Sequence, residues 1–311
     1  MTKTSKIPSN LTPLLDSLPQ EHREKILAGW SAPRNIVSFR VNHLNSSREE
    51  VVKALGEASL LSSAWDGFED AFYMAKEEHE YTLRGLEIYK QGKIYVQSLT
   101  SMIPALCLGL HPGQKILDMT AAPGSKTTQM ASMLAWKCEI TALEKFGIRH
   151  DKLVHTIKTQ GAEKCVKVIK MDATELVQFF SQNAQKNQGR KMFDRILLDA
   201  PCSSDGRINL GDETTYKWYS PEKSASKALL QYELLEQARK MLKDDGKLVY
   251  STCAVNRTEN EEVIQKFLTK HPEYHLLPCP ITPDYTLEDN MNRWYPSETM
   301  EGFFVVVLEK K

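Results

Sequence analysis

The chain has 311 residues, and 41% of them are hydrophobic, so it can bury a sizeable core and is not globally disordered. Its 40 basic and 40 acidic residues give a formal net charge of zero, which argues against an indiscriminate polyanion binder. No apolar run is long enough to span a bilayer, and residues 1–8 lack the apolar segment of a signal peptide. We therefore expect a cytoplasmic, monomeric protein without a membrane partner, with one large and one smaller domain.

The first part of the chain has the pattern of a small α+β unit. Residues 1–13 are expected to form a loose tail, and a helical pattern follows over residues 14–29. Residues 36–42 alternate and are rich in β-branched side chains, which predicts a strand. Ser47 and Glu50 have the spacing of a capping box, which predicts the start of a helix.

Short strands near residues 60–66 and 70–75 complete this unit, which we place at residues 1–91. Nothing in it has the pattern of a catalytic site. Arg40 and Asn42 are polar positions in the predicted strand, where they could contact a partner or lie on a solvated sheet face.

The second unit, residues 92–311, is expected to begin with a strand at residues 92–97 and a helix at residues 101–106. Strands and helices then alternate, which favours an α/β fold with a mostly parallel sheet covered on both faces. The five strands of this alternation are predicted at residues 115–119, 139–144, 166–171, 193–199 and 247–252. Two further strands, at residues 274–277 and 303–308, are expected to add an antiparallel end and bring the sheet to seven strands.

Apolar stripes predict the helices between these strands. Short helices are expected at residues 126–135 and 176–180. The helix between them is expected to carry on one face Ile148, Leu153, Val154 and Ile157.

Ser220 and Pro221 have the chemistry of a helix start, as an N-cap and a first-turn proline. The long helix that follows is expected to end before Gly246 and to have an apolar stripe of Ala225, Leu229, Tyr232, Leu235 and Leu242. Thr258 and Glu261 have capping-box spacing and predict the start of a further helix.

Two segments lack periodicity. Residues 181–191 are polar and predict a loop. Residues 203–219 are expected to form a mobile surface loop.

Six cysteines are dispersed along the chain, with no Cys-x-x-Cys motif. We therefore predict neither a metal site nor a disulfide framework. Cys107, Cys138 and Cys165 lie among apolar residues and are expected to be buried. Cys202 and Cys253 follow predicted strands, where two thiols can carry chemistry.

Polar and reactive residues follow each of the five strands. In an open parallel sheet the carboxyl ends of the strands form one edge, and ligands bind there. The residues at that edge are Glu144, Asp172, Asp199, Cys202 and Cys253. A carboxylate at the end of the second strand suits a ribose diol, since it accepts two hydroxyl hydrogen bonds.

The turn after the first strand, residues 120–126, is built of small residues and opens a helix, so a ligand can approach its backbone closely. It is not a phosphate-binding P-loop, because Thr120 and Ser125 stand where that motif has glycine. The Gly-x-Gly-x-x-Gly dinucleotide fingerprint is also missing.

Three motifs resemble those of the Sun-type RNA (cytosine-5) methyltransferases. They are Asp-Met-Thr-Ala-Ala-Pro-Gly-Ser-Lys-Thr at residues 118–127, Asp-Ala-Pro-Cys-Ser at residues 199–203 and Ser-Thr-Cys at residues 251–253. With weaker matches on either side, the resemblance covers roughly residues 36–309. It implies a class I (Rossmann-like) methyltransferase that uses S-adenosylmethionine, behind a small N-terminal domain that resembles an RNA-recognition fold.

The resemblance also implies roles for individual residues. Cys253 would be the nucleophile, Cys202 would assist product release, and Asp199 would act between cofactor and target base together with Lys126. Glu144 would hold the cofactor ribose. The rest of the cofactor site would comprise Thr120, Ala121, Ala122, Pro123, Gly124, Ser125, Lys126, Arg149, Asp172 and Asp199.

Departures from the family pattern remove no reactive group: Ser125 replaces a common glycine, Thr120 a common cysteine, and Arg257 interrupts the usual acidic run. The resemblance favours RNA as partner and ribosomal RNA over transfer RNA as substrate. Transfer RNA methylation, methylation of DNA or protein, nucleotide hydrolysis and non-catalytic RNA binding are the alternatives. The reactive cysteines argue against the last.

Overall fold

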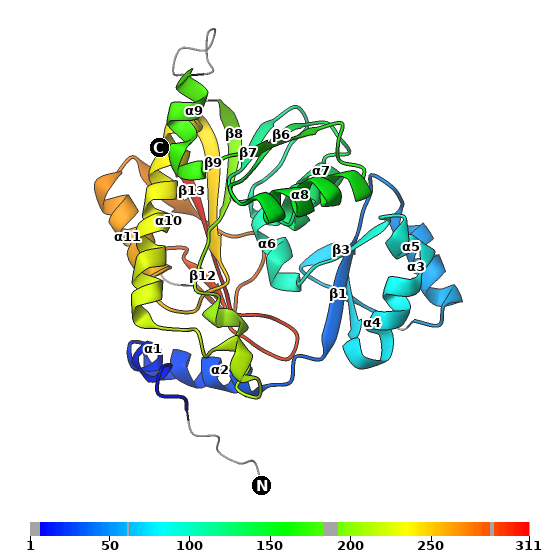
Figure 1. Cartoon of the computed structure of the whole chain (residues 1–311), viewed down its shortest axis with the longest axis horizontal. Helices are drawn as coiled ribbons and strands as arrows, with labels where there is room; N and C mark the ends of the chain where they lie inside the picture. The colour runs from blue at the N-terminus through cyan, green and yellow to red at the C-terminus, as the bar shows by residue number, and fades with distance from the viewer. Residues whose placement is uncertain (1–6, 61, 183–191, 287–288, 311) are drawn as a thin grey trace.

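The computed structural model describes residues 7–60, 62–182, 192–286 and 289–310. Two sheets organise the chain (Figure 1): a smaller one in the N-terminal part and a larger one that carries the alternating strands and helices. None of the described helices is both long and apolar enough to cross a membrane.

The smaller sheet has four antiparallel strands in the order β2-β3-β1-β4. The elements of this unit are β1 (Ile36–Val41), α3 (Arg48–Glu57), β2 (Ser63–Trp65), β3 (Phe68–Ala75), α4 (Lys76–Gly85), α5 (Glu87–Lys90) and β4 (Ile94–Val96). The predicted start of α3 is confirmed, because the Ser47 side chain accepts a hydrogen bond from the Glu50 amide.

Strand β4 lies beyond residue 91 but belongs to the smaller sheet. It pairs with β1, with Tyr95 opposite Arg40. The expectation that a strand at residues 92–97 begins the second unit is therefore wrong for the sheet, because its backbone hydrogen bonds go to β1. A domain boundary at residue 91 stays a prediction.

Arg40 and Asn42 are both fully buried, so the structure excludes one of the two alternatives for them, the solvated sheet face. The Arg40 guanidinium donates to Gln97 Oε1 at 2.9 Å, and Asn42 Nδ2 donates to the Gln160 carbonyl at 2.9 Å. Arg40 also donates to the Ser125 carbonyl in the larger unit. These side chains join the two units, which the local sequence pattern does not reveal.

The first two helices, α1 (Thr12–Asp16) and α2 (Gln20–Ser31), pack against the larger unit rather than the smaller sheet. Trp30 is fully buried, and its indole N–H donates to the Asp205 carbonyl at 3.0 Å. The cluster is completed by Ile208, Tyr219, Val255 and Tyr295. The first two helices therefore lie beside segments from the second half of the chain, at the bottom of the view in Figure 1.

The larger sheet has nine strands among the described residues, in the order β11-β12-β13-β9-β8-β5-β6-β7, with β10 beside β13. The strands are β5 (Lys115–Asp118), β6 (Glu139–Glu144), β7 (Val166–Lys170), β8 (Phe193–Asp199), β9 (Leu242–Thr252), β10 (Tyr274–Leu277), β11 (Tyr285–Thr286), β12 (Asn292–Trp294) and β13 (Phe303–Lys310). Strands β9, β8, β5, β6 and β7 run parallel, and β10 to β13 pair antiparallel. The predicted fold class is confirmed.

The strand count differs from the expected seven because β11 and β12 escape the sequence pattern. These strands have two and three residues, too few to show an alternation. They extend the antiparallel end of the sheet, so the sheet is mixed rather than mostly parallel.

Helices cover both faces of the larger sheet. One face carries α6 (Leu99–Cys107), α7 (Ser125–Met133) and α8 (Gly147–Thr159), and the other α9 (Leu176–Gln182), α10 (Pro221–Met241) and α11 (Glu261–Lys270) (Figure 1). Alternate strand residues feed the two cores: Leu197 and Val249 face the first group, and Leu198 and Leu248 the second. The order of the strands reverses between β5 and β8, which places the site there.

Two helices carry apolar residues that the sequence pattern assigns to the wrong face. Ile148 and Val154 of α8 are 78% and 43% exposed, while Leu153 and Ile157 are buried as expected. Leu229 of α10 is 68% exposed. The buried face of α10 includes polar Ser224 and Gln231, which form hydrogen bonds that an apolar stripe does not predict.

The helix starts are mixed in outcome. Ser220 caps α10 as predicted, by accepting a hydrogen bond from the Lys223 amide. Helix α11 begins at Glu261 behind Asn260, with no side-chain cap, so the capping box predicted from Thr258 does not form. Asn260 instead uses its side chain to accept a hydrogen bond from the Thr252 hydroxyl at 2.6 Å.

Residues 203–219 form the surface loop expected only in part, since residues 211–214 are exposed while most of residues 203–208 are buried. They contain two short 3-10 helices, Asp205–Arg207 and Glu213–Thr215, and both Asp205 and Ile208 are fully buried. The missing periodicity reflects irregular backbone, part of which packs against α2. The loop predicted at residues 181–191 lies almost wholly outside the described residues.

Candidate functional site

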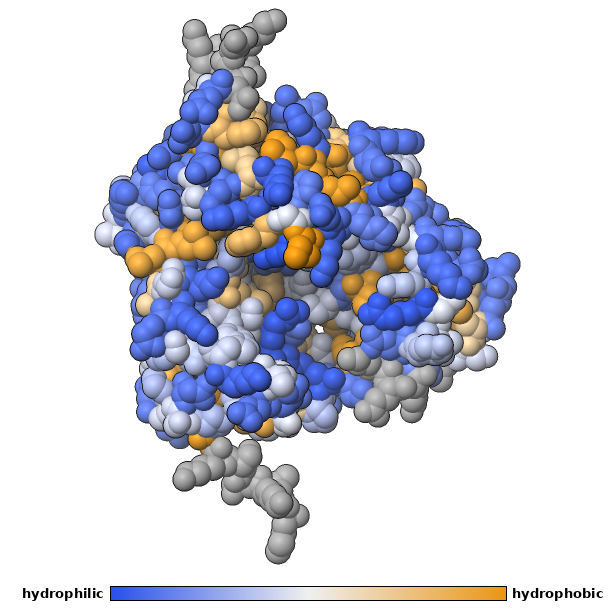
Figure 2. Space-filling model, viewed as in Figure 1, coloured by the Kyte–Doolittle hydropathy of each residue, from blue (hydrophilic) through white to orange (hydrophobic). Residues whose placement is uncertain are grey.

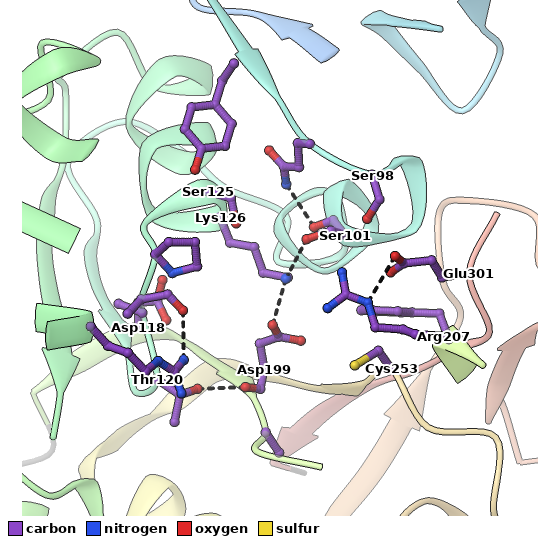
Figure 3. A pocket seen from close by; sticks show the side chains of 18 of the residues that line it. Ser98, Ser101, Asp118, Thr120, Ser125, Lys126, Asp199, Arg207, Cys253 and Glu301 are labelled. Atoms are coloured by element: carbon purple, nitrogen blue, oxygen red, sulfur yellow. Dashed lines mark hydrogen bonds and ion pairs between the residues drawn. The ribbon is translucent and has the colours of Figure 1, made fainter. Parts of the chain in front are cut away.

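A cavity of about 400 Å³ lies at the carboxyl ends of β5, β8 and β9 (Figure 3). The turn after β5 forms one wall, with Thr120, Ala121, Ala122, Pro123, Ser125 and Lys126. The opposite wall holds Cys253 and Arg207. Figure 2 shows this face of the molecule hollowed where the two units meet.

Gly124 is the one residue of the predicted turn that is not in the cavity wall. It precedes α7 with φ +108°, a left-handed conformation that favours glycine. An added Cβ would lie 3.1 Å from Leu153 and 3.0 Å from Thr156 of α8. Gly124 thus shapes the turn and packs it on α8, and the small residues beside it face the cavity.

Lys126 is buried in the cavity wall, where its ammonium group has two polar partners. Its ammonium group donates to Ser101 Oγ at 2.8 Å and forms an ion pair with Asp199 Oδ2 at 2.7 Å (Figure 3). A charge this deeply buried requires such partners. The Ser101 contact comes from α6, which the sequence pattern does not single out.

Asp199 is the hub between the turn and the strand that carries Cys253. Its Oδ1 accepts from Ser251 Oγ at 2.8 Å, and its backbone carbonyl accepts from Thr120 Oγ1 at 2.8 Å. Through its carboxylate and its backbone carbonyl, Asp199 therefore aligns the ends of β5, β8 and β9. The predicted role of Asp199, between cofactor and target base, stays a prediction.

A second cavity of about 180 Å³ adjoins the first, because Thr120 and Arg149 line both. Glu144 and Asp172 line it at the ends of β6 and β7. Glu144 is 5% exposed, and its Oε1 accepts from the Phe146 amide at 2.9 Å. Its apolar wall includes Met119, Met171, Ala173, Pro201, Leu230 and Leu234.

The two cavities fit the shape and chemistry of S-adenosylmethionine. Glu144 keeps unused lone pairs on a fixed carboxylate, as a ribose diol requires. The apolar wall between Met119 and Met171 suits an adenine ring. The turn at residues 120–126 offers small side chains beside the methionine end. Among the described residues, no group of three or more His, Cys, Asp or Glu side chains could hold a metal ion.

The two cysteines of the motifs, Cys202 and Cys253, lie in contact with each other at the cavity wall. Their sulfur atoms are 3.3 Å apart, and Ser204 Oγ lies 3.3 Å from Cys253 Sγ. Cys253 lines the cavity itself, while Cys202 stands next to it. Both thiols are free. Three cysteines outside the motifs, Cys107, Cys138 and Cys165, are buried as expected.

The thiol pair is electrostatically asymmetric. The hydrogen bond with Cys202 lowers the pKa of Cys253; burial opposes this, and Arg207 and Ser204 reinforce it, so the net pKa lies below its ordinary value. The same hydrogen bond, with burial and the charge of Cys253, raises the pKa of Cys202 well above its ordinary value. Cys253 therefore ionises first.

Arg207 and Glu301 belong to the site but have no sequence signal that singles them out. Arg207 forms an ion pair with Glu301 at 3.0 Å, and both line the cavity with Cys253 (Figure 3). The Arg207 side chain is 55% exposed. Its position depends on the packed segment 203–219, which local patterns misread as a surface loop.

A buried hydrogen-bond network fixes the backbone behind the cysteines. Glu259 accepts from the Ser203 amide at 2.9 Å and from Asn256 Nδ2 at 2.7 Å. Asn256 also donates to Asp205 at 2.8 Å, and burial raises the pKa of Asp205 to about 6. The segments that follow Cys202 and Cys253 are thereby locked to each other.

A family model described as 16S rRNA methyltransferase RsmB/F matches residues 105–309. Among curated relatives, ribosomal RNA small subunit methyltransferase F of Shewanella woodyi is 33% identical over 284 residues, 88% of this chain and 57% of the relative. Probable ribosomal RNA small subunit methyltransferase B of Bacillus subtilis is 30% identical over 254 residues, 82% of this chain and 52% of the relative. The chain thus spans about half the length of these relatives.

Solved structures share the fold over nearly the whole chain. A methyltransferase homolog protein from Pyrococcus horikoshii superposes with a TM-score of 0.81 and 27% identity, covering 97% of this chain and 94% of that one. NSun6 from Pyrococcus horikoshii with SFG superposes with a TM-score of 0.83 and 24% identity, covering 97% and 98%. The smaller sheet and the larger one therefore recur together in related folds.

Proposed function

Because the chain belongs to the 16S rRNA methyltransferase RsmB/F family, we propose that it transfers a methyl group from S-adenosylmethionine to carbon 5 of a cytosine in RNA. The observation that carries the proposal is the pair of thiols, 3.3 Å apart, of which Cys253 lines the same cavity as Asp199. Carbon 5 of cytosine is a poor nucleophile and needs a covalent activator, which a thiolate provides.

The cofactor takes the two joined cavities. Glu144 would hold the ribose, Asp172 would lie near the adenine, and Arg149, which lines both cavities, would contact the cofactor between them. The turn at residues 120–126 surrounds the methionine end. When bound, S-adenosylmethionine supplies the methyl group that carbon 5 accepts.

The Cys253 thiolate attacks carbon 6 of the cytosine, and the electron pair of the 5,6 double bond becomes available at carbon 5 for the methyl group. The ring nitrogen takes up a proton as carbon 6 is attacked. Lys126 donates a hydrogen bond to Asp199 at 2.7 Å on the cavity wall, and the pair assists that step. Arg207 favours the thiolate from which the attack starts.

Product release requires loss of the proton on carbon 5 and expulsion of the Cys253 sulfur. Once Cys253 is bonded to carbon 6 it carries no charge, so the hydrogen bond to its thiolate and its charge no longer raise the pKa of Cys202, and of the three main causes only burial remains. Cys202 gives up its own proton to solvent, and its thiolate then takes the carbon 5 proton. The 5,6 double bond reforms, the ring nitrogen returns its proton and the Cys253 thiolate leaves. The target base must be unstacked to reach this pocket, which favours single-stranded or looped RNA.

Ribosomal RNA of the small subunit is the proposed substrate. It is the substrate that the names of the curated relatives give, and transfer RNA is the alternative. Residues 1–91 serve in this proposal as an RNA-binding region. Non-catalytic RNA binding is less favoured, since it has no use for two adjacent thiols.

Methyl transfer to defined RNAs tests the proposal. Small-subunit ribosomal RNA and total transfer RNA from cells lacking the protein are incubated separately with it and tritiated S-adenosylmethionine, and the nucleosides are separated. Label in 5-methylcytidine is expected from wild type and from Cys165→Ala, a matched buried-thiol control, and no label from Cys253→Ala. Label in another nucleoside, or turnover by Cys253→Ala, would overturn the mechanism.

The release step makes a separate prediction. Cys202→Ala should retain attack by Cys253 but lose the base for the carbon 5 proton, so a covalent protein–RNA adduct accumulates. The adduct is visible as a slowly migrating band on a denaturing gel. Cys202→Ala combined with Cys253→Ala should abolish that band, and rapid turnover by Cys202→Ala without adduct would contradict the assignment.

A further inference from the structure

A cleft of about 370 Å³ lies outside the reaction cavity, between α5 and β4 of the smaller unit and α8 of the larger one. Tyr95 and Val96 line both spaces, so the cleft and the reaction cavity are adjoining. Its volume falls within the roughly 300–1,000 Å³ of sites that bind small organic ligands. We call it the outer cleft.

The outer cleft is basic. Arg84, Lys90 and His155 line it, and no carboxylate is among the described residues of its wall. Arg84 pairs with Glu80 at 2.8 Å and Lys90 with Glu87 at 3.0 Å, from outside the cleft. Exposed ion pairs of this kind are worth only about 0–1 kcal/mol, so both cations can exchange a carboxylate for a phosphate at small cost.

The cleft also offers an aromatic ring and a vacant acceptor. Tyr89 lies in its wall, with the Arg84 guanidinium 5.5 Å from its ring centroid. Gln160 is 3% exposed, lines the cleft, and its Oε1 has no hydrogen-bond partner. Its amide group makes only a long contact, 3.4 Å, to the Ile94 carbonyl. A buried acceptor without a donor is costly unless a ligand supplies one.

We propose that the outer cleft binds a nucleotide that flanks the target cytosine in the same RNA strand. Arg84 and Lys90 contact its phosphate, Tyr89 stacks on its base, and a base amino group or 2′-hydroxyl donates to Gln160. This inference rests on the proposed RNA methylation. It adds to it a second contact point, across the junction of the two units, that fixes how the strand enters the reaction cavity.

Substitutions in the cleft wall test the inference. Arg84→Ala with Lys90→Ala should raise KM for small-subunit ribosomal RNA about tenfold and leave kcat within about twofold. The salt slope of RNA binding should fall by about one for each phosphate that the variant no longer neutralises. Tyr89→Leu should weaken binding of a fluorescein-labelled single-stranded RNA of about 12 nucleotides without changing the salt slope. Binding is followed by fluorescence anisotropy.

Lys53→Ala is the matched control, because Lys53 makes a comparable exposed ion pair with Glu57 on α3, away from the cleft. Unchanged S-adenosylmethionine binding shows that the cleft variants are folded. If wild type methylates RNA and the cleft variants match it, or Lys53→Ala weakens RNA binding equally, the outer cleft is not a nucleotide site and the methylation proposal stands. If wild type methylates no RNA, the methylation proposal fails, and the inference with it.

Discussion

At the scale of single residues, the site depends on charges placed where they are costly. Lys126 and Asp199 form an ion pair inside the cavity wall, and Asp118 lies 1% exposed beneath them. Asp118 accepts a hydrogen bond from Thr127 at 2.7 Å, yet burial raises its pKa to about 6. Cys253 shows the opposite effect, since its neighbours favour the charged form.

Thiol alkylation should report the activation of Cys253. Because its pKa is lowered, the rate of modification by iodoacetamide should reach half its maximum below about pH 8.5, the value of an ordinary thiol. Arg207→Gln should move that midpoint upward, and Arg48→Gln on α3 should not. Mass spectrometry of the Cys253 peptide gives the rate at each pH. An unshifted midpoint in Arg207→Gln would separate Arg207 from the thiolate.

Asp118 should make stability depend on pH in an unusual direction. Its folded pKa of about 6 exceeds its unfolded value, so the folded state holds a proton that the unfolded state releases. Stability is therefore lost as pH rises from about 4 to 6, by about 3 kcal/mol for this group. Asp118→Asn lacks this titrating group, so its free energy of unfolding should rise relative to that of wild type by the same amount over the same pH range. Urea unfolding at several pH values measures it, and a constant difference would contradict the shift.

At the scale of elements, the strands of the larger sheet follow the sequence pattern closely. β6, β8 and β10 have the predicted bounds, because each alternates or is continuously apolar between polar turns. The three motifs at residues 118–127, 199–203 and 251–253 lie at one sheet edge, as the alternation of strands and helices predicts. The family resemblance drawn from them is confirmed by the match over residues 105–309.

What the sequence does not predict depends on contacts between distant residues. Ile208 and Tyr219 of the segment 203–219 are buried in one cluster with Trp30 and Val255, which no local pattern connects to them. Arg207 is consequently missing from the predicted site. The sequence pattern allows Arg40 to be a solvated strand residue, but in the structure α7 covers it and accepts its hydrogen bonds. Helix α10 begins as predicted, but polar residues on its buried face obscure the apolar stripe.

Arg40 should be among the most sensitive residues of β1. It is fully buried and joins the strand to Gln97 and to Thr128 at the start of α7, at 2.9 and 2.8 Å. Arg40→Ala leaves those partners unpaired, which should cost about 3–5 kcal/mol of unfolding free energy and weaken cofactor binding at the turn. Denaturant unfolding and calorimetric titration with S-adenosylmethionine measure the two effects.

The control is Arg48→Ala on α3. Arg48 makes one exposed hydrogen bond, to the Glu69 carbonyl, and lies over the Phe72 ring. We expect a loss within about 1 kcal/mol and unchanged cofactor affinity. Equal losses in the two variants would show that Arg40 does not join the units.

At the scale of the whole molecule, the beginning of the chain supports the reactive end of the sheet. Helices α1 and α2 pack on the segment that carries Asp205 and Arg207, and the Leu210 amide donates to the Trp30 carbonyl at 2.8 Å. The smaller sheet is tied to the turn through Arg40. The cavity is thus lined by residues from distant parts of the described chain, from Tyr95 to Phe303.

Trp30 should therefore affect both stability and catalysis. Trp30→Ala removes a fully buried indole and should cost about 3–5 kcal/mol of unfolding free energy. Trp30→Phe keeps much of the packing but loses the hydrogen bond to Asp205, for about 1 kcal/mol. Circular dichroism and methyl transfer are measured together; a Trp30→Ala protein with wild-type stability would contradict the supporting role.

The position of β13 has a consequence for synthesis. Strand β9, which ends one residue before Cys253, pairs with β13 on one side. The Gly302 amide, just before β13, donates to the Gly206 carbonyl at 2.8 Å. An added Cβ at Gly206 would lie 2.3 Å from the Gly302 carbonyl oxygen, so the two segments are in close contact. On the ribosome, β5 to β9 can therefore emerge and pair, but the walls around the thiol stay incomplete until residues 301–310 have left the exit tunnel. The reactive sulfur therefore acquires its final surroundings only after residues 301–310 have emerged and paired.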